Sequence, residues 1–172
     1  MYPEVERLLP QYPHRGPRMV FQGQDGRRFE DVSARSGPGA TVPHSSRGAA
    51  VGDYDDDGDL DVLVMNMNEP PSLLRNDTKN ANRWLKVKLV GTRSNRAGIG
   101  ATVIVTVDGR RQAQAVLSQS SYYSHDDVRL HFGLGAARSV EKVEVRWPSG
   151  GVDVVRDVES NRVLTVREGS RR

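Results

Sequence analysis

The chain has 172 residues, a formal net charge of +3 and no cysteine. This length suits one good-sized domain, or one domain with a smaller unit. The lack of cysteine excludes disulfides, thiolate metal ligands and a cysteine nucleophile. No apolar run approaches the about 18 residues that cross a bilayer, so we expect no membrane insertion. The arginines are scattered singly rather than clustered, and we therefore expect no nucleic-acid partner.

The N-terminal part holds short, separated elements. Four prolines among residues 1–18 predict extended surface chain, and no apolar core of a signal peptide is visible there. Asp25-Gly26 lies between short apolar stretches and predicts a hairpin turn, because glycine accepts positive φ. A connector rich in glycine, proline and serine follows over 36–46. Residues 48–51 and 60–65 then predict two strands on either side of a run of aspartates.

From Asn82 onward the sequence consists of short segments that alternate apolar and polar residues. Seven such segments are visible: 84–90, 101–107, 111–118, 128–134, 142–147, 152–158 and 163–168. A period of two predicts strands with one buried face, and many short strands predict an antiparallel sandwich or barrel. We expect an all-β chain with a first domain over 1–81 and a β-sandwich domain over 82–172. Trp84 and Trp147 are expected to pack into the sandwich core.

The run GDYDDDGDLDV places six aspartates within nine positions. Its spacing, DxDxDGxxD, brings oxygen ligands at alternate positions of a tight loop toward one point. Five residues are the predicted metal ligands, the fourth through its backbone carbonyl: Asp53, Asp55, Asp57, Asp59 and Asp61. Calcium (Ca²⁺) takes 6 to 8 oxygens in flexible geometry, which suits this loop better than the strict octahedron of magnesium does. The alternative is a solvated acidic turn that holds no metal. In either case Asp56 is expected to be solvent-exposed and not to be a metal ligand.

An EF-hand is excluded although the first half of the loop matches one. That motif needs a bidentate glutamate at its twelfth position and a helix on each side. The twelfth position here is Val64, within a β-rich run.

Two resemblances rest on these and further motifs. The stretch AAVGDYDDDGDLDVLVMN resembles an FG-GAP (VCBS) repeat, the integrin-α-like unit whose calcium loop joins two strands of a β-propeller blade. The motifs SNRAGIGA, HFGLG and WPSG of the C-terminal half resemble an ASPIC/UnbV domain. Their combination is similar to the cartilage acidic protein and enediyne-cluster UnbV-like family.

The resemblance implies partial propeller blades followed by a β-sandwich, as the C-terminal part of a longer protein. A blade alone cannot bury its faces, so missing blades or a partner are expected to cover the exposed blade edge. It also implies an extracellular or periplasmic place, and a role in recognition or adhesion through a glycan or protein ligand. Two alternatives stay open: an enzyme or accessory protein of secondary-metabolite (enediyne-type) biosynthesis, and a purely structural scaffold.

A second candidate site is SQSSYYSHDD, residues 118–127. Its aromatic rings could stack on sugar faces while its polar groups bind hydroxyls. The candidate ligand-binding residues are Tyr122, Tyr123, His125 and Asp126. The alternative is a strand end with Tyr123 packed inward and a turn over 124–127.

The sequence points to no catalytic residue. The four histidines, His14, His44, His125 and His131, form no metal-binding pair of the HExxH kind. Ser149 lies in WPSGG, which lacks the serine-centred GxSxG of a nucleophile elbow. We therefore expect a non-catalytic β module.

Overall fold

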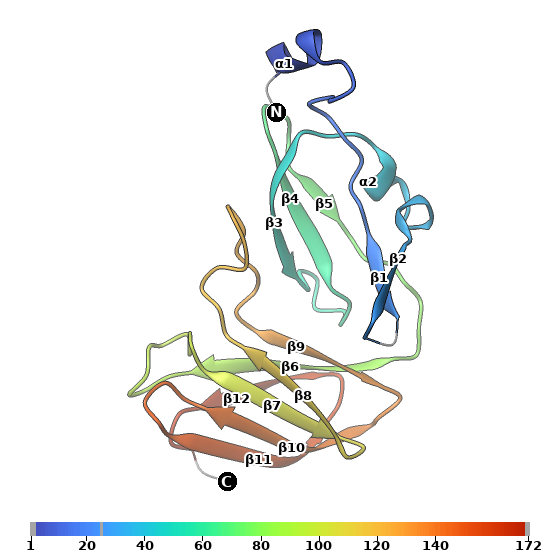
Figure 1. Ribbon diagram of the computed structural model, residues 1–172. Coiled ribbons are helices and arrows are strands. Elements are labelled where there is room, and N and C mark those ends of the chain that lie inside the picture. The colour runs from blue at the N-terminus through green and yellow to red at the C-terminus, as the bar shows by residue number, and fades with distance from the viewer. Residues whose placement is uncertain (1–2, 25, 171–172) are drawn as a thin grey trace. The chain divides into compact units, whose positions relative to one another are not determined.

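The computed structural model describes residues 3–24 and 26–170, and strands make up most of the regular structure. This confirms the all-β expectation. The chain divides into two compact units, which Figure 1 shows in ribbon form. The first comprises Met1–Ala50, Asp61–Arg75 and Ser121–Ser124; the second comprises Val51–Leu60, Asn76–Ser120 and His125–Arg172. The domain boundary at 81/82 and the propeller identity of the first domain stay predictions.

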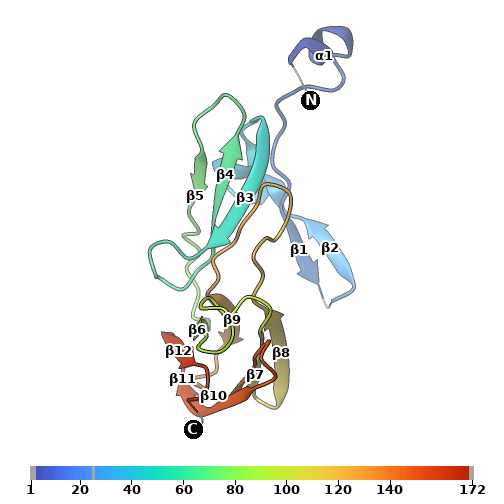
Figure 2. The ribbon, with the colours of Figure 1, turned by 90° about the vertical axis from the view of Figure 1, so that its left-hand side faces the viewer.

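The first unit contains a hairpin and a three-stranded sheet, blue to green in Figure 2. Strands β1 (Phe21–Gln24) and β2 (Arg28–Asp31) pair antiparallel, as predicted, although Asp25 of the expected turn lies outside the described residues. The sheet has the order β3-β4-β5, with bounds Ser46–Gly52, Asp61–Asn66 and Ser72–Leu74. The two strands predicted around the aspartates are therefore confirmed.

Three short helical segments were not predicted: helix α1 (Pro3–Leu8), the 3₁₀ turn η1 (Ser33–Arg35) and helix α2 (Pro38–Thr41). The expectation of extended chain is wrong for α1. Glu4 and Glu6 lie in its first turn and Arg7 in its last, an arrangement that complements the helix dipole. Six residues are too few to display a helical period in the sequence.

The second unit is built from two sheets. One has the order β11-β10-β7-β8 and the other β12-β6-β9. The strand bounds are β6 Arg83–Val90, β7 Thr102–Val107, β8 Arg110–Ala115, β9 Leu130–Gly135, β10 Ser139–Arg146, β11 Val152–Glu159 and β12 Arg162–Arg167. All seven correspond to the segments predicted from alternation.

The apolar faces of these two sheets share one core, which makes the unit a sandwich. Alternate residues of β6 and β7 supply much of it, because successive side chains of a strand point to opposite faces. Leu85, Val87, Val103 and Val105 are completely buried there. Trp147 is also buried in this core, as expected.

One strand pair departs from the antiparallel expectation. β12 runs parallel to β6, whereas β9 pairs antiparallel with the other edge of β6. The chain enters β12 at Asn161, whose backbone N–H donates to the carbonyl of Trp84 (2.7 Å) and whose side-chain oxygen accepts the N–H of Trp84 (3.2 Å). These bonds fix the entry point beside the start of β6, so that both strands run in the same direction.

Candidate metal centre

The aspartate loop, residues 53–60, connects β3 to β4 and is shaped by its first carboxylate. Asp53 is buried and accepts the backbone N–H of Asp57 (3.1 Å) and of Gly58 (2.8 Å). Gly58 has φ of +101°, a conformation that side chains other than hydrogen rarely allow. The local sequence therefore folds the loop back toward Asp53.

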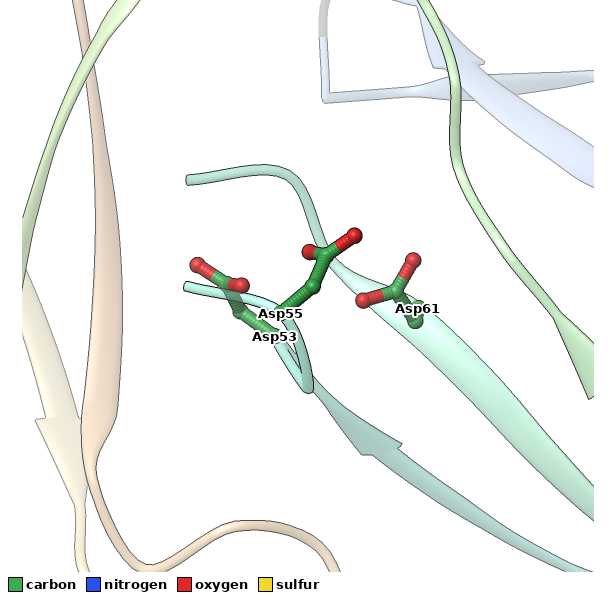
Figure 3. Close-up of side chains that lie close together, drawn as sticks. All are labelled: Asp53, Asp55 and Asp61. Atoms are coloured by element: carbon green, nitrogen blue, oxygen red, sulfur yellow. The ribbon is translucent and has the colours of Figure 1, made fainter. Parts of the chain in front are cut away.

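Three of the five predicted ligands come together, two from this loop and Asp61 from the start of β4. One carboxylate oxygen from each of Asp53, Asp55 and Asp61 lies within 4.8 Å of the others. Figure 3 shows these three side chains close together. Asp53 and Asp61 are buried, whereas Asp55 is exposed. These three acidic residues could hold a metal ion. Asp57 and Asp59 lie outside this group of three, and their part in metal binding stays a prediction.

Two cations of the second unit contact the aspartate loop, Lys86 within β6 and Arg129 just before β9. Lys86 of β6 places its Nζ 2.7 Å from Asp53 and 2.6 Å from Asp56, and its side chain is only 1% exposed. Arg129 contacts Asp56 at 3.0 Å. These hydrogen bonds, that of Lys86 first, hold the pKa of Asp56 below its ordinary value. Asp56 was expected to be a solvated extra; instead it joins the loop to the sandwich.

An aromatic pair supports the loop at Gly58. A Cβ at this position would lie 1.8 Å from Trp84 Nε1, so only glycine permits the contact. His131 Nε2 donates to the Gly58 carbonyl at 2.8 Å, and its ring stacks on Trp84. The expectation that Trp84 packs into the core is therefore wrong: it is half-buried and supports the aspartate loop.

Sequence reasoning missed Lys86, Arg129 and His131 as parts of this centre. Along β6, the core face carries Leu85 and Val87, and Lys86 points to the opposite face. A lysine on the outer face of a strand is normally exposed to solvent. Its burial results from a loop 30 residues earlier in the chain, and no local pattern signals such a contact.

Of the second candidate site, Tyr122 and Tyr123 belong to the first unit, and His125 and Asp126 belong to the second. Tyr122 and Tyr123 are each 73% exposed, with ring centroids 4.2 Å apart, and Tyr123 has φ of +53°. The alternative with Tyr123 packed inward is therefore wrong. His125 is exposed and its Nδ1 lies 2.8 Å from the Asp126 carbonyl. Asp126 accepts the backbone N–H of Val51 at 2.8 Å.

The remaining histidines have acidic partners. His44 Nδ1 lies 2.6 Å from Glu69, and His14 contacts Glu6. Among residues 3–24 and 26–170, no helix is long and apolar enough to cross a membrane.

Comparison with known proteins finds one matching family and several similar proteins. Residues 91–172 match the family described as ASPIC and UnbV. The chain is 32% identical to cartilage acidic protein 1 of Mus musculus over 137 residues, which is 76% of this chain and 21% of the relative. The human protein of the same name gives 32% identity, with 76% and 20% covered. That of Xenopus tropicalis gives 28% over 173 residues, with 95% and 26% covered. The chain thus spans about a fifth to a quarter of the length of these curated relatives.

Proposed function

We propose that this chain is a calcium-binding, non-catalytic β module of an extracellular recognition or adhesion protein. The observation that carries the proposal is the approach of one oxygen from each of Asp53, Asp55 and Asp61 to within 4.8 Å of the others. Like charges at this separation repel unless a cation lies among them. Lys86 contacts Asp53 but is not found at Asp55.

The chemistry of the donors favours calcium. All three groups are hard oxygen ligands, and the loop offers further carboxylates and backbone carbonyls within a few residues. Calcium accepts such a set with 6 to 8 ligands at about 2.3–2.6 Å, whereas magnesium retains several waters and an octahedral shell. Asp55 has no hydrogen bond or ion pair to any residue within 3–24 and 26–170, which leaves its carboxylate available to a metal.

Two observations support a recognition role. The relatives are called cartilage acidic protein 1, a name that refers to a tissue rich in extracellular matrix. The sheet β3-β4-β5 also exposes large apolar side chains: Leu63 is 41%, Met65 51% and Leu73 48% exposed. Exposed apolar side chains grouped on one sheet are typical of a surface that another protein element covers. Further propeller blades or a protein partner would supply that cover.

Titration calorimetry on the whole chain tests the metal site. We expect one calcium site that survives excess magnesium and that is lost or weakened at least tenfold in Asp55→Asn. Within the described part of the chain, Asp55 makes no hydrogen bond or ion pair that holds the loop, so the change removes a ligand charge without removing a structural bond. The matched control is Asp59→Asn, which keeps the backbone carbonyl that is the predicted ligand at that position. Unchanged calcium affinity in Asp55→Asn would overturn the proposal.

A further inference from the structure

We propose that a cavity in the second unit binds one neutral sugar ring. This inference rests on the proposed recognition function and names its ligand class. The cavity measures about 240 Å³ and lies among the start of the aspartate loop, the end of β8, the start of β9, and the parts of the connecting segment at 117, 120 and 126–129. All residues that line it belong to the second unit. Asp126 is the only member of the candidate set Tyr122, Tyr123, His125 and Asp126 among them.

The cavity combines an aliphatic wall with a few polar groups. Its apolar lining comes from Val51, Leu60, Leu117, Val128 and Leu130. Three polar side chains with remaining hydrogen-bonding capacity accompany this wall: Gln114, Ser120 and Asp126. Small-molecule sites typically have this composition, in which apolar walls supply contact and a few polar groups fix orientation.

The polar groups suit hydroxyls. Asp126 uses one oxygen to accept the Val51 N–H, and its second carboxylate oxygen remains an acceptor. Gln114 donates from Nε2 to the carbonyl of His131, which leaves its Oε1 as an acceptor. Ser120 adds a hydroxyl that can donate or accept. A ligand with several O–H groups on a compact carbon ring satisfies all three and covers the aliphatic wall with its C–H face.

Charge disfavours an anionic ligand here. The two cations in the lining are already matched by carboxylates: Lys86 contacts Asp53 and Asp56, and Arg129 contacts Asp56 and Asp127. Asp126 contributes a further negative charge with no cationic partner among the described residues. A carboxylate or sulfate group would therefore meet repulsion that no free cation offsets.

Size limits the occupant to a single ring. Pockets for drug-sized ligands measure about 300–1,000 Å³, and the value of about 240 Å³ lies below that range. An extended oligosaccharide would therefore place one residue inside the cavity and the rest outside it.

Saturation-transfer NMR on the whole chain tests this inference, with methyl glycosides of neutral hexoses as probes. We expect at least one neutral glycoside to bind. Asp126→Asn keeps the acceptor for the Val51 N–H but removes the charge, and should weaken binding at least tenfold. Leu117→Trp should abolish it, because Leu117 is 59% exposed and a larger side chain can fill the cavity without entering the core. Asp157→Asn is the matched control, because it is the same change on β11, outside the cavity, at a positive φ that asparagine tolerates.

Methyl glucuronide and propylammonium serve as anionic and cationic probes. Binding of only the anion, only the amine or no probe would overturn the inference, as would equal binding by wild type, Asp126→Asn and Leu117→Trp. The titrations are repeated with calcium and with chelator. Sugar binding without a calcium site would refute the metal proposal alone, and a calcium site without sugar binding would refute this inference alone.

Discussion

Two buried carboxylates of the second unit, Glu168 and Asp53, have different kinds of partners. Glu168, just after β12, accepts three backbone N–H groups, those of Thr92, Arg93 and Ser94, each at 2.7 Å. Its other oxygen accepts the hydroxyls of Ser94 (2.9 Å) and Ser149 (2.5 Å). In the aspartate loop, the carboxylate of Asp53 receives two backbone N–H groups and a lysine, and further carboxylates crowd around it.

The difference lies in the kind of partner that each carboxylate has. Glu168 has five neutral hydrogen-bond donors and needs no cation. Its hydrogen bonds hold the SNRAGIGA and WPSG segments together. Although burial opposes ionisation, these hydrogen bonds hold the pKa of Glu168 far below its ordinary value. The aspartate loop instead brings several carboxylates together, with one oxygen from each of Asp53, Asp55 and Asp61 within 4.8 Å of the others. Lys86 and Arg129 supply part of the missing positive charge, and a bound cation would supply the rest.

Removal of Lys86 should cause the largest loss of stability. Lys86→Ala leaves the buried Asp53 without its cation, and the loss of one partner of a buried ion pair costs about 3–5 kcal/mol. Urea unfolding of the whole chain measures the change. Lys88→Ala is the control, because Lys88 lies on the same face of β6 and is exposed. Equal losses in both variants would contradict a structural role for the Lys86–Asp53 pair.

Replacement of Glu168 should have the next largest effect. Glu168→Gln keeps one oxygen acceptor but turns an amide N–H₂ group toward donors, so several of the five bonds are lost. We expect a clear loss of stability, smaller than that in Lys86→Ala because no uncompensated charge remains. Thermal unfolding against Glu159→Gln, an exposed site on β11, provides the measurement. A melting temperature no lower than that of the control would show that the hydrogen bonds to Glu168 contribute nothing.

The same variant should change the pH dependence of stability. Because the folded-state pKa of Glu168 lies below its ordinary value of 4.5, its contribution is complete above that pH. The contribution is lost progressively as the pH falls from about 5 toward about 3. The free energy of unfolding of Glu168→Gln should therefore fall less steeply over this range than that of wild type. Parallel curves would contradict the assigned pKa direction.

The smallest effect is expected at Asp56, which is 62% exposed although it contacts both Lys86 and Arg129. Exposed ion pairs contribute little and are screened by salt. Asp56→Asn should thus destabilise far less than Lys86→Ala, and the difference from wild type should shrink in about 1 M salt. A loss as large as that in Lys86→Ala would show that Asp56, rather than Asp53, is the main partner of the lysine.

The sequence predicted what depends on local periodicity or spacing. The seven sandwich strands followed from alternation, and the meeting of Asp53, Asp55 and Asp61 followed from the spacing of a tight loop. Alternation specifies which face is buried but not which strand lies alongside, so the parallel pairing of β12 with β6 was not foreseen.

The unpredicted features depend on contacts between distant segments. Lys86 and Arg129 meet Asp56 across 30 and 73 residues of chain. Glu168 accepts hydrogen bonds from residues 92–94, more than 70 residues earlier in the chain. One interpretation placed Tyr123 inward at a strand end, but Tyr123 adopts a positive φ and its ring is exposed.

Hydrogen exchange with calcium and with chelator tests the central claim most directly, because the two centres can be compared within one sample. The amides of Asp57 and Gly58 donate to Asp53, and those of Thr92, Arg93 and Ser94 donate to Glu168. If a cation relieves the repulsion among the carboxylates of the aspartate loop, calcium should stabilise the loop by about 2.7 kcal/mol at a hundredfold excess over Kd and slow exchange at 57 and 58. The amides at 92–94 should change little. No slowing at 57 and 58, or an equal change at both centres, would contradict this account.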